Sequence, residues 1–416
     1  MRHIGRFIVL PVLLLFFATD LLAEGEFRLG IIGTTTSHVP AFVKVFQDPN
    51  APESCRGFKI TAAYPGGMPD NPSSWDRVRK YADELAAGGV KICNTIEEML
   101  AECDGVLLES VDGRPHLEQA KPVIAAGKPL YIDKPMAGSL ADVITIFRLA
   151  EEKKVPVFSA SSLRYAPGYQ RMRNEQPFGE ILGCDAWSPC SLEKHHPDLF
   201  WYGIHGVETL FTVMGPGCKE VVRIRSDKYE LAVGTWSDGR IGTFRGIKSG
   251  KSGYGATVFG EKGFGDAGTY AGYKPLVEEI GRFFKTGKAP IEPRETIEIF
   301  AFMEAADRSK VGDDKEMLRV SIDELIEESS KEISMPVHLN LAVDGSLTFG
   351  TEVSTNVKTV ELDNLKTTLD ELAKDKSNIR IKVILRSQKG VPIETVQKVC
   401  DHLGQAMLAN YLYDYQ

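Results

Sequence analysis

The chain has 416 residues, of which 43% are hydrophobic and 25% are charged, a composition typical of a globular protein with more than one domain. Its 57 acidic residues outnumber its 49 basic residues, which gives a net charge of −8 at pH 7. No basic cluster offsets this charge, so composition argues against nucleic acid as a partner.

The first 23 residues have the layout of a secretory signal peptide. Arg2 and Arg6 precede the apolar run 7–18, and Ala23 supplies the small residue that a cleavage site needs. The apolar run is short for a membrane span, so an uncleaved anchor is the weaker alternative. We expect residues 1–23 to direct export to the periplasm.

Residues 27–158 alternate strand and helix patterns, which is typical of a parallel sheet with crossover helices. Short apolar runs predict strands over residues 27–32, 58–64, 105–109, 130–132 and 155–159. Helical periodicity predicts helices over residues 41–47, 75–87, 96–101, 116–126 and 140–153. The predicted fold class is α/β, with an N-terminal Rossmann-like nucleotide-binding domain.

Residues 159–322 carry a different pattern, in which strands follow one another. We expect strands over residues 221–226, 229–236, 240–246 and 255–260, and helices over residues 201–214, 274–285 and 294–307. Asp238-Gly239 suits a hairpin turn. The pattern predicts an α+β domain whose helices cover one face of an open sheet.

The charged residues 323–335 are predicted to be a linker to a small C-terminal α+β domain, residues 336–416. We expect strands over 337–343, 346–349 and 379–385 and helices over 362–374 and 393–408. With Asp344-Gly345, Arg386 and Val391-Pro392, this segment resembles the periplasmic domain of ExbD/TolR proteins. The resemblance implies a protein partner in the cell envelope.

Residues 30–38 connect the first predicted strand to the first predicted helix. A dinucleotide fingerprint has three glycines here, so that the pyrophosphate approaches the backbone and the helix packs closely. Gly33 matches the first, but Thr35 and His38 occupy the other two positions. The hydroxyls and the helix amino terminus still suit an anion, and a merely capped helix is the alternative. The candidate nucleotide contacts are Gly30, Gly33, Thr34, Thr35, Thr36, Ser37 and His38.

Residues 127–135 form a short apolar strand that ends in an acid, a lysine and a proline. Open α/β folds bind ligands at this edge of the sheet, and Pro135 fixes the backbone behind Lys134. The stretch resembles the Glu-Lys-Pro signature of the Gfo/Idh/MocA oxidoreductases, with Asp133 replacing the glutamate. The resemblance covers roughly residues 27–320 and implies NAD or NADP, a sugar or polyol substrate and a homo-oligomer. It makes Lys134 catalytic and places Asp133 and His116 near the cofactor.

Two later segments carry candidate substrate contacts. Residues 161–167 resemble the family's passage into the substrate domain, where Arg164 suits an anionic group. Residues 201–208 resemble its Asp-x-x-x-His-x-x-Asp helix, with His205 on the histidine and Trp201 on the first aspartate. An indole cannot accept a proton as a carboxylate does. We therefore take His205 as catalytic and assign substrate binding to Arg164, Tyr202 and Glu208.

Three residues of types that bind metal ions precede that helix, namely His195, His196 and Asp198. Their spacing relative to His205 and Glu208 is not a ligand signature, and we expect a solvated loop and no metal ion.

Two hypotheses about function remain open at this point. The first is an exported NAD(P)-dependent oxidoreductase that acts on a sugar or polyol. The second is a non-catalytic relative that binds a carbohydrate or an envelope partner. Thr35, His38 and Trp201 favour the second, as does the strand 58–64, which ends without the acid that binds ribose hydroxyls. Whether the chain is an active enzyme is therefore left open.

Overall fold

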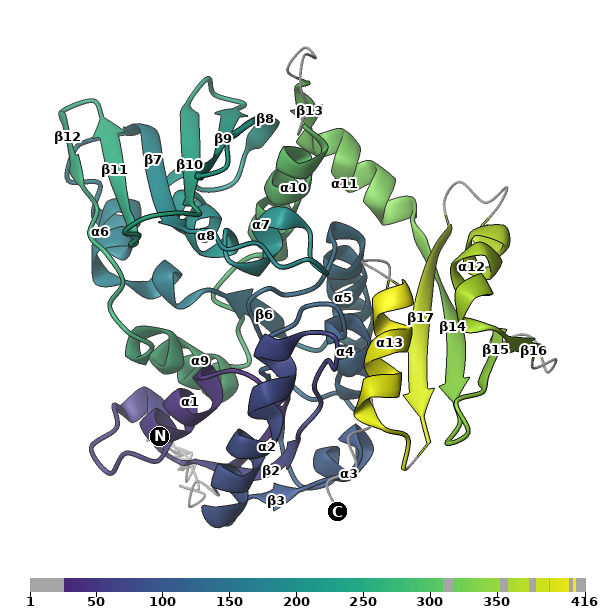
Figure 1. Ribbon diagram of the computed structural model, residues 1–416. Helices are drawn as coiled ribbons and strands as arrows, with labels where there is room; N and C mark the ends of the chain where they lie inside the picture. The colour runs from purple at the N-terminus through teal and green to yellow at the C-terminus, as the bar shows by residue number, and fades with distance from the viewer. Residues whose placement is uncertain are drawn as a thin grey trace, which may run out of the picture.

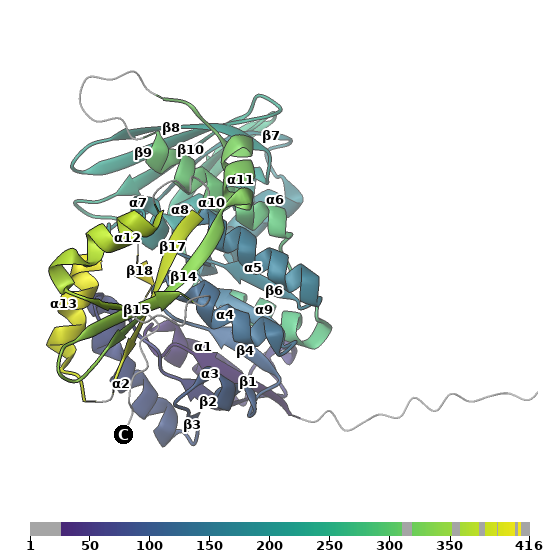
Figure 2. The same cartoon turned by 90° about the vertical axis from the view of Figure 1, so that its right-hand side faces the viewer.

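The computed structural model describes residues 26–309, 318–351, 358–373, 379–388, 390–403 and 407–408. The predicted signal peptide, residues 1–23, lies outside these ranges. Three sheets organise the described chain, and a mixed sheet stacks above the N-terminal one (Figures 1 and 2). Within the described ranges, no helix combines the length and apolar character that crossing a bilayer requires.

The N-terminal sheet is parallel and has the strand order β3-β2-β1-β4-β5-β6, the Rossmann order. Its strands are β1 (Phe27–Ile32), β2 (Phe58–Tyr64), β3 (Lys91–Ile92), β4 (Gly105–Leu108), β5 (Leu130–Asp133) and β6 (Val157–Ala160). The crossover helices are α1 (His38–Phe46), α2 (Pro72–Ala87), α3 (Ile96–Leu100), α4 (His116–Ala125) and α5 (Leu140–Lys153). The predicted Rossmann-like sheet is confirmed, and only the two-residue β3 was not expected.

A mixed sheet follows, in the order β12-β11-β7-β10-β9-β8-β13. Its strands are β7 (Ile181–Pro189), β8 (Cys218–Arg225), β9 (Tyr229–Trp236), β10 (Ile241–Ile247), β11 (Gly255–Gly260), β12 (Gly263–Asp266) and β13 (Val320–Ser321). The helices beside it are α6 (Pro167–Glu175), α7 (Asp198–Trp201), α8 (Ile204–Met214) and α10 (Pro293–Arg308). Helix α9 (Lys274–Thr286), which was predicted to cover this sheet, instead packs against α1 and the Rossmann sheet. The helix predicted over 201–214 is broken, so Trp201 ends α7 and His205 belongs to α8.

The third sheet has the order β16-β15-β14-β17-β18. It comprises β14 (Ile333–Leu341), β15 (Leu347–Thr351), β16 (Lys358–Val360), β17 (Ile379–Ser387) and β18 (Met407–Leu408), with helices α12 (Leu365–Ala373) and α13 (Ile393–Leu403). The predicted linker 323–335 has regular structure, because these residues form most of α11 (Ile322–Lys331) and the start of β14. The predicted helix 393–408 is also too long, since residues 407–408 form a strand.

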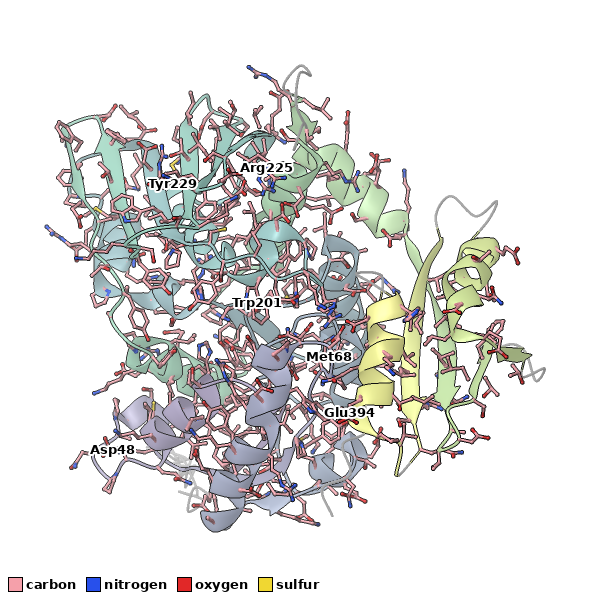
Figure 3. All side chains as sticks on the ribbon, in the orientation of Figure 1. Asp48, Met68, Trp201, Arg225, Tyr229 and Glu394 are labelled. Carbon is pink, nitrogen blue, oxygen red and sulfur yellow. The ribbon has the colours of Figure 1, made fainter. Side chains whose placement is uncertain are left out.

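Helix α13 packs against the Rossmann domain through the segment that follows β2 (Figure 1). Met68 is buried in the hydrophobic cluster of the C-terminal domain and lies beside α13 (Figure 3). The side-chain amide of Gln397 donates to the Pro69 carbonyl at 3.1 Å, and Lys194 pairs with Asp401 at 3.2 Å. The C-terminal domain is therefore docked on the chain that borders the nucleotide loop.

Candidate functional site

A cavity of about 370 Å³ lies at the carboxyl edge of the Rossmann sheet, where the first two domains meet. This volume is in the range of small-molecule sites, roughly 300–1,000 Å³. Its wall combines hydroxyls, aromatic rings and two cationic side chains: Thr36, Ser37, His38, Ser73, Arg77, Val111, Lys134, Ser162, Leu163, Ser191, Trp201, Tyr202, His205, Tyr254, Tyr270 and Tyr273.

Lys134 reaches the cavity from the residue after β5. Its side chain is almost fully buried, and its ammonium lies 6.0 Å from the centre of the Tyr202 ring. Pro135 follows directly and limits the backbone conformations that could redirect the lysine. The structure thus brings the predicted catalytic lysine and Tyr202 into one site.

His205 enters the same cavity from the first turn of α8. Its Nδ1 lies 2.7 Å from the Ser161 hydroxyl, which fixes the ring orientation. Burial lowers the pKa of His205 well below its usual value, and the Lys134 ammonium lowers it further. The imidazole is therefore uncharged at neutral pH and can accept a hydrogen bond from a bound hydroxyl group.

Four tyrosines form one side of the cavity: Tyr202, Tyr254, Tyr270 and Tyr273. The ring of Tyr270 lies 5.9 Å from the rings of both Tyr254 and Tyr273. Burial raises the pKa values of these last three phenols, so they remain hydrogen-bond donors at neutral pH. Aromatic faces with neutral hydroxyls match the alternating C–H and O–H groups of a sugar or polyol. Three of these residues follow β10, too far along the sequence from Lys134 for local patterns to reveal them.

Arg164 and Glu208 do not line the cavity, although both were predicted to bind substrate. The Arg164 guanidinium donates to Glu208 and, at 2.7 Å, to Glu295, and all three side chains are buried. Arg173 donates two further hydrogen bonds to Glu295. The prediction is therefore corrected: these residues form an ion-pair network that joins α8 and α10 behind the cavity.

The predicted nucleotide loop, residues 30–38, is hydrogen-bonded to other segments of the same chain. The N–H groups of Gly33 and Thr34 donate to the carbonyls of Tyr64 and Pro65, both at 2.8 Å. The Thr34 hydroxyl donates to the Val78 carbonyl, and the Thr35 hydroxyl accepts from the Val111 N–H. Both threonines are fully buried, so the side chains predicted to hold a phosphate are already paired inside the protein.

Gly30 is also not a nucleotide contact, because it lies inside β1 and a Cβ there would approach the Cys103 sulfur to 2.8 Å. Of the predicted loop contacts, only Thr36, Ser37 and His38 line the cavity. His116 is fully buried, and its ring nitrogens lie 2.8 Å from the Ser110 carbonyl and 3.1 Å from the Met136 carbonyl. It joins the loops after β4 and β5 without lining the cavity.

The segment 65–71 covers the loop and is held in place by Arg114. The buried guanidinium makes two 2.8 Å hydrogen bonds to Asp70 and pairs with Asp112 at 2.7 Å. His196 lies 3.0 Å from Asp112, and both His195 and His196 are buried beside Glu193. The predicted solvated loop is therefore wrong: the two histidines belong to this ion-pair network.

An extended dinucleotide does not fit the described conformation in the way that a Rossmann domain usually holds one. That mode needs loop N–H groups facing the pyrophosphate and an open edge beyond the second strand. Here Gly33 and Thr34 donate to the chain, and residues 65–71 are buried where that edge would lie. The cavity is open at Lys134 and His205, but the N–H groups of Gly33 and Thr34 are not available to a pyrophosphate.

Comparisons with known proteins agree with this architecture. Residues 27–161 match the family model GFO_IDH_MocA, described as an oxidoreductase family with an NAD-binding Rossmann fold. The chain is 32% identical over 133 residues to the inositol 2-dehydrogenase of Gluconacetobacter diazotrophicus, which is 30% of this chain and 39% of that protein. It is 33% identical over 92 residues to an uncharacterized oxidoreductase of Synechocystis, 22% of this chain and 23% of that protein. The chain thus spans less than half the length of these curated relatives.

Solved structures extend the likeness to the second domain. An oxidoreductase of Thermotoga maritima superposes with a TM-score of 0.58 at 16% identity, over 72% of this chain and 99% of that chain. The scyllo-inositol dehydrogenase of Lactobacillus casei gives a TM-score of 0.56 at 12% identity, over the same shares. At these identities the likeness shows the fold alone. Residues 27–161 therefore carry a Rossmann domain of the GFO_IDH_MocA oxidoreductase type.

Proposed function

We propose that the chain is an oxidoreductase of the GFO_IDH_MocA type whose substrate is a sugar or polyol. The observation that carries this proposal is the convergence of Lys134 and His205, from two domains, on one cavity lined by tyrosines. One curated relative is an inositol 2-dehydrogenase, which supports a polyhydroxylated substrate.

The chemistry available in the cavity is proton transfer at a hydroxyl group. Lys134 donates a charge-assisted hydrogen bond to the reacting oxygen, and the neutral His205 takes up its proton. The Ser161 hydroxyl holds the imidazole in place during this transfer. Trp201 lines the wall where the family's aspartate would stand.

A second candidate is a carbohydrate-binding protein without redox activity. The buried nucleotide loop favours it, because Gly33, Thr34 and Thr35 are already hydrogen-bonded within the chain. For the first candidate, segment 65–71 has to move away before an extended NAD or NADP can bind.

Calorimetry separates the two candidates. The chain is titrated with NAD(H) and NADP(H), and in parallel with myo-inositol and simple hexoses. Nucleotide binding in the micromolar range supports the oxidoreductase. No nucleotide binding at millimolar concentration, together with saturable polyol binding that Lys134→Met weakens, establishes the second candidate in its place.

Three further expectations belong to this proposal. Residues 1–23 direct export to the periplasm, which cell fractionation tests. The domain 336–416, which resembles ExbD/TolR periplasmic domains, contacts an envelope protein. The open face of the mixed sheet supports a homo-oligomer, because Ile224, Ile241, Phe259 and Phe264 are exposed there on one side.

A further inference from the structure

Three buried side chains with metal-binding atoms meet beside the cavity. His38 is the first residue of α1, Glu109 follows β4, and Asp133 ends β5. One ligand atom from each lies within 4.8 Å of the other two, and all three residues are buried. The group is distinct from the Arg114 and Arg164 networks described above.

Glu109 is the member that needs an explanation. It is fully buried, and neither carboxylate oxygen has a hydrogen-bond partner among the described residues. A buried carboxyl group without partners is costly, and nearly all such groups in folded proteins are paired or bind a cation. Burial raises the pKa of Glu109 well above its usual value, the Asp133 carboxylate raises it further, and the Lys134 ammonium offsets part of this rise.

Each of His38 and Asp133 places one possible ligand atom within 4.8 Å of a Glu109 carboxylate oxygen. The His38 Nδ1 and the Asp133 Oδ2 are 2.7 Å apart, yet the two atoms are not aligned as a hydrogen bond. The other Asp133 oxygen accepts from the Tyr131 hydroxyl at 3.3 Å, and the His38 ring packs against Phe42 and Tyr273. The Tyr131 hydroxyl thus orients the Asp133 carboxylate as an outer-shell partner orients a metal ligand, and aromatic packing holds the His38 ring.

We propose that His38, Glu109 and Asp133 bind a divalent transition-metal ion such as Zn²⁺. One imidazole nitrogen and two carboxylates form a donor set that such ions accept, whereas an ion that requires only oxygen donors fits less well. The charge of the ion offsets both carboxylates and satisfies the free oxygens of Glu109. Because His38 also lines the cavity, the ion lies at its floor, near Lys134.

Calorimetry with Zn²⁺ tests the site on the full chain after chelator treatment. We expect one Zn²⁺ per chain, and we expect His38→Ala and Glu109→Gln each to weaken binding by about tenfold or more. Glu109→Gln keeps the shape of the side chain, so circular dichroism should show an unchanged fold. His402→Ala, which removes an exposed histidine on α13, is the matched control and should bind Zn²⁺ as the unmodified chain does.

Co²⁺ gives a second readout, because its visible absorption reports nitrogen and oxygen ligands directly. The spectrum should appear with the unmodified chain and disappear with His38→Ala. The proposal is overturned if no Zn²⁺ binds at millimolar concentration, or if binding survives in both site variants. Neither result depends on whether the cavity binds a nucleotide or a polyol.

Discussion

At the scale of single residues, buried charges separate into those that build the fold and those that face the cavity. Arg164 and Glu208 are paired with each other, and Glu295 completes their network. Lys134 and His205 instead reach the cavity wall, where a ligand can meet them. Residue type alone did not distinguish these roles, but the position of each partner does.

Arg164→Ala should destabilise the protein strongly. The substitution leaves the buried carboxylates of Glu208 and Glu295 without their shared cation, which typically costs about 3–5 kcal/mol. Urea unfolding measures the change. Arg171→Ala on α6 is the control, because its pair with Glu175 is exposed and should contribute about 0.5 kcal/mol or less. Equal effects of the two substitutions would contradict the buried network.

Lys134→Met should raise the pKa of His205. Burial is the first cause of the lowered pKa and persists, so the value should move toward the usual one without reaching it. Below about pH 6.5 the unfolded His205 ring binds a proton while the folded ring stays neutral, so the free energy of unfolding decreases as the pH falls. Lys134→Met should make this decrease smaller. Ring ¹⁵N chemical shifts report the titration. Lys121→Met on α4 should leave it unchanged, and a downward shift in Lys134→Met would refute the coupling.

At the scale of elements, the segment between β2 and α2 determines whether the nucleotide loop is accessible. Asp70 anchors this segment through two hydrogen bonds to Arg114, and the carbonyls of Tyr64 and Pro65 occupy the loop N–H groups. The nucleotide loop is therefore blocked by its contacts with the segment after β2, which the sequence of residues 30–38 alone cannot predict.

Asp70→Asn should loosen this closure. The amide cannot replace the ion pair with Arg114, so the segment should detach more often and expose the amides of Gly33 and Thr34. Hydrogen exchange followed by mass spectrometry should show faster exchange over residues 30–36. Asp76→Asn, an exposed position on α2, should leave exchange there unchanged. Unchanged protection in Asp70→Asn would mean that the Arg114 network does not hold the segment.

At the scale of the whole molecule, the mixed sheet presents an uncovered apolar face. Cross-strand register places Ile224, Ile241, Phe259 and Phe264 on one side, with exposed fractions of 50%, 54%, 40% and 73%. Phe259 and Phe264 stack on each other with ring centres 6.2 Å apart, and exposed apolar side chains grouped in this way typically mark an interface between protein chains.

The double variant Ile241→Asp, Phe264→Asp should therefore be monomeric, whereas the unmodified chain should associate. Charged side chains on that face would have to be desolvated on association. Light scattering coupled to gel filtration gives the mass. Val343→Asp changes an exposed apolar residue of the C-terminal domain and should not alter it. If the unmodified chain is itself monomeric, the open face has another use.

The sequence was sufficient to predict most of this architecture, because hydrophobic periodicity is local. Strands β1, β2, β9 and β11 have the predicted bounds. The site was harder to predict, because it depends on which distant groups meet. Lys134 and His205 were found through a family motif, whereas Tyr254 and Tyr270 belong to no motif and reach the cavity only through the fold. Glu109 was noted only as the end of a strand, since its missing partners become visible only in three dimensions.

The docking of α13 on the segment after β2 links the two ends of the chain. Met68 is shared with the C-terminal core, and Asp70, two residues later, belongs to the Arg114 network that closes the loop. A partner that prefers the undocked C-terminal domain would thereby favour an open nucleotide loop. By thermodynamic reciprocity, a ligand that requires the open loop would tighten that partner's binding to the same extent. Binding at the C-terminal domain and binding at the nucleotide loop would then be coupled, and the coupling could be measured at either site.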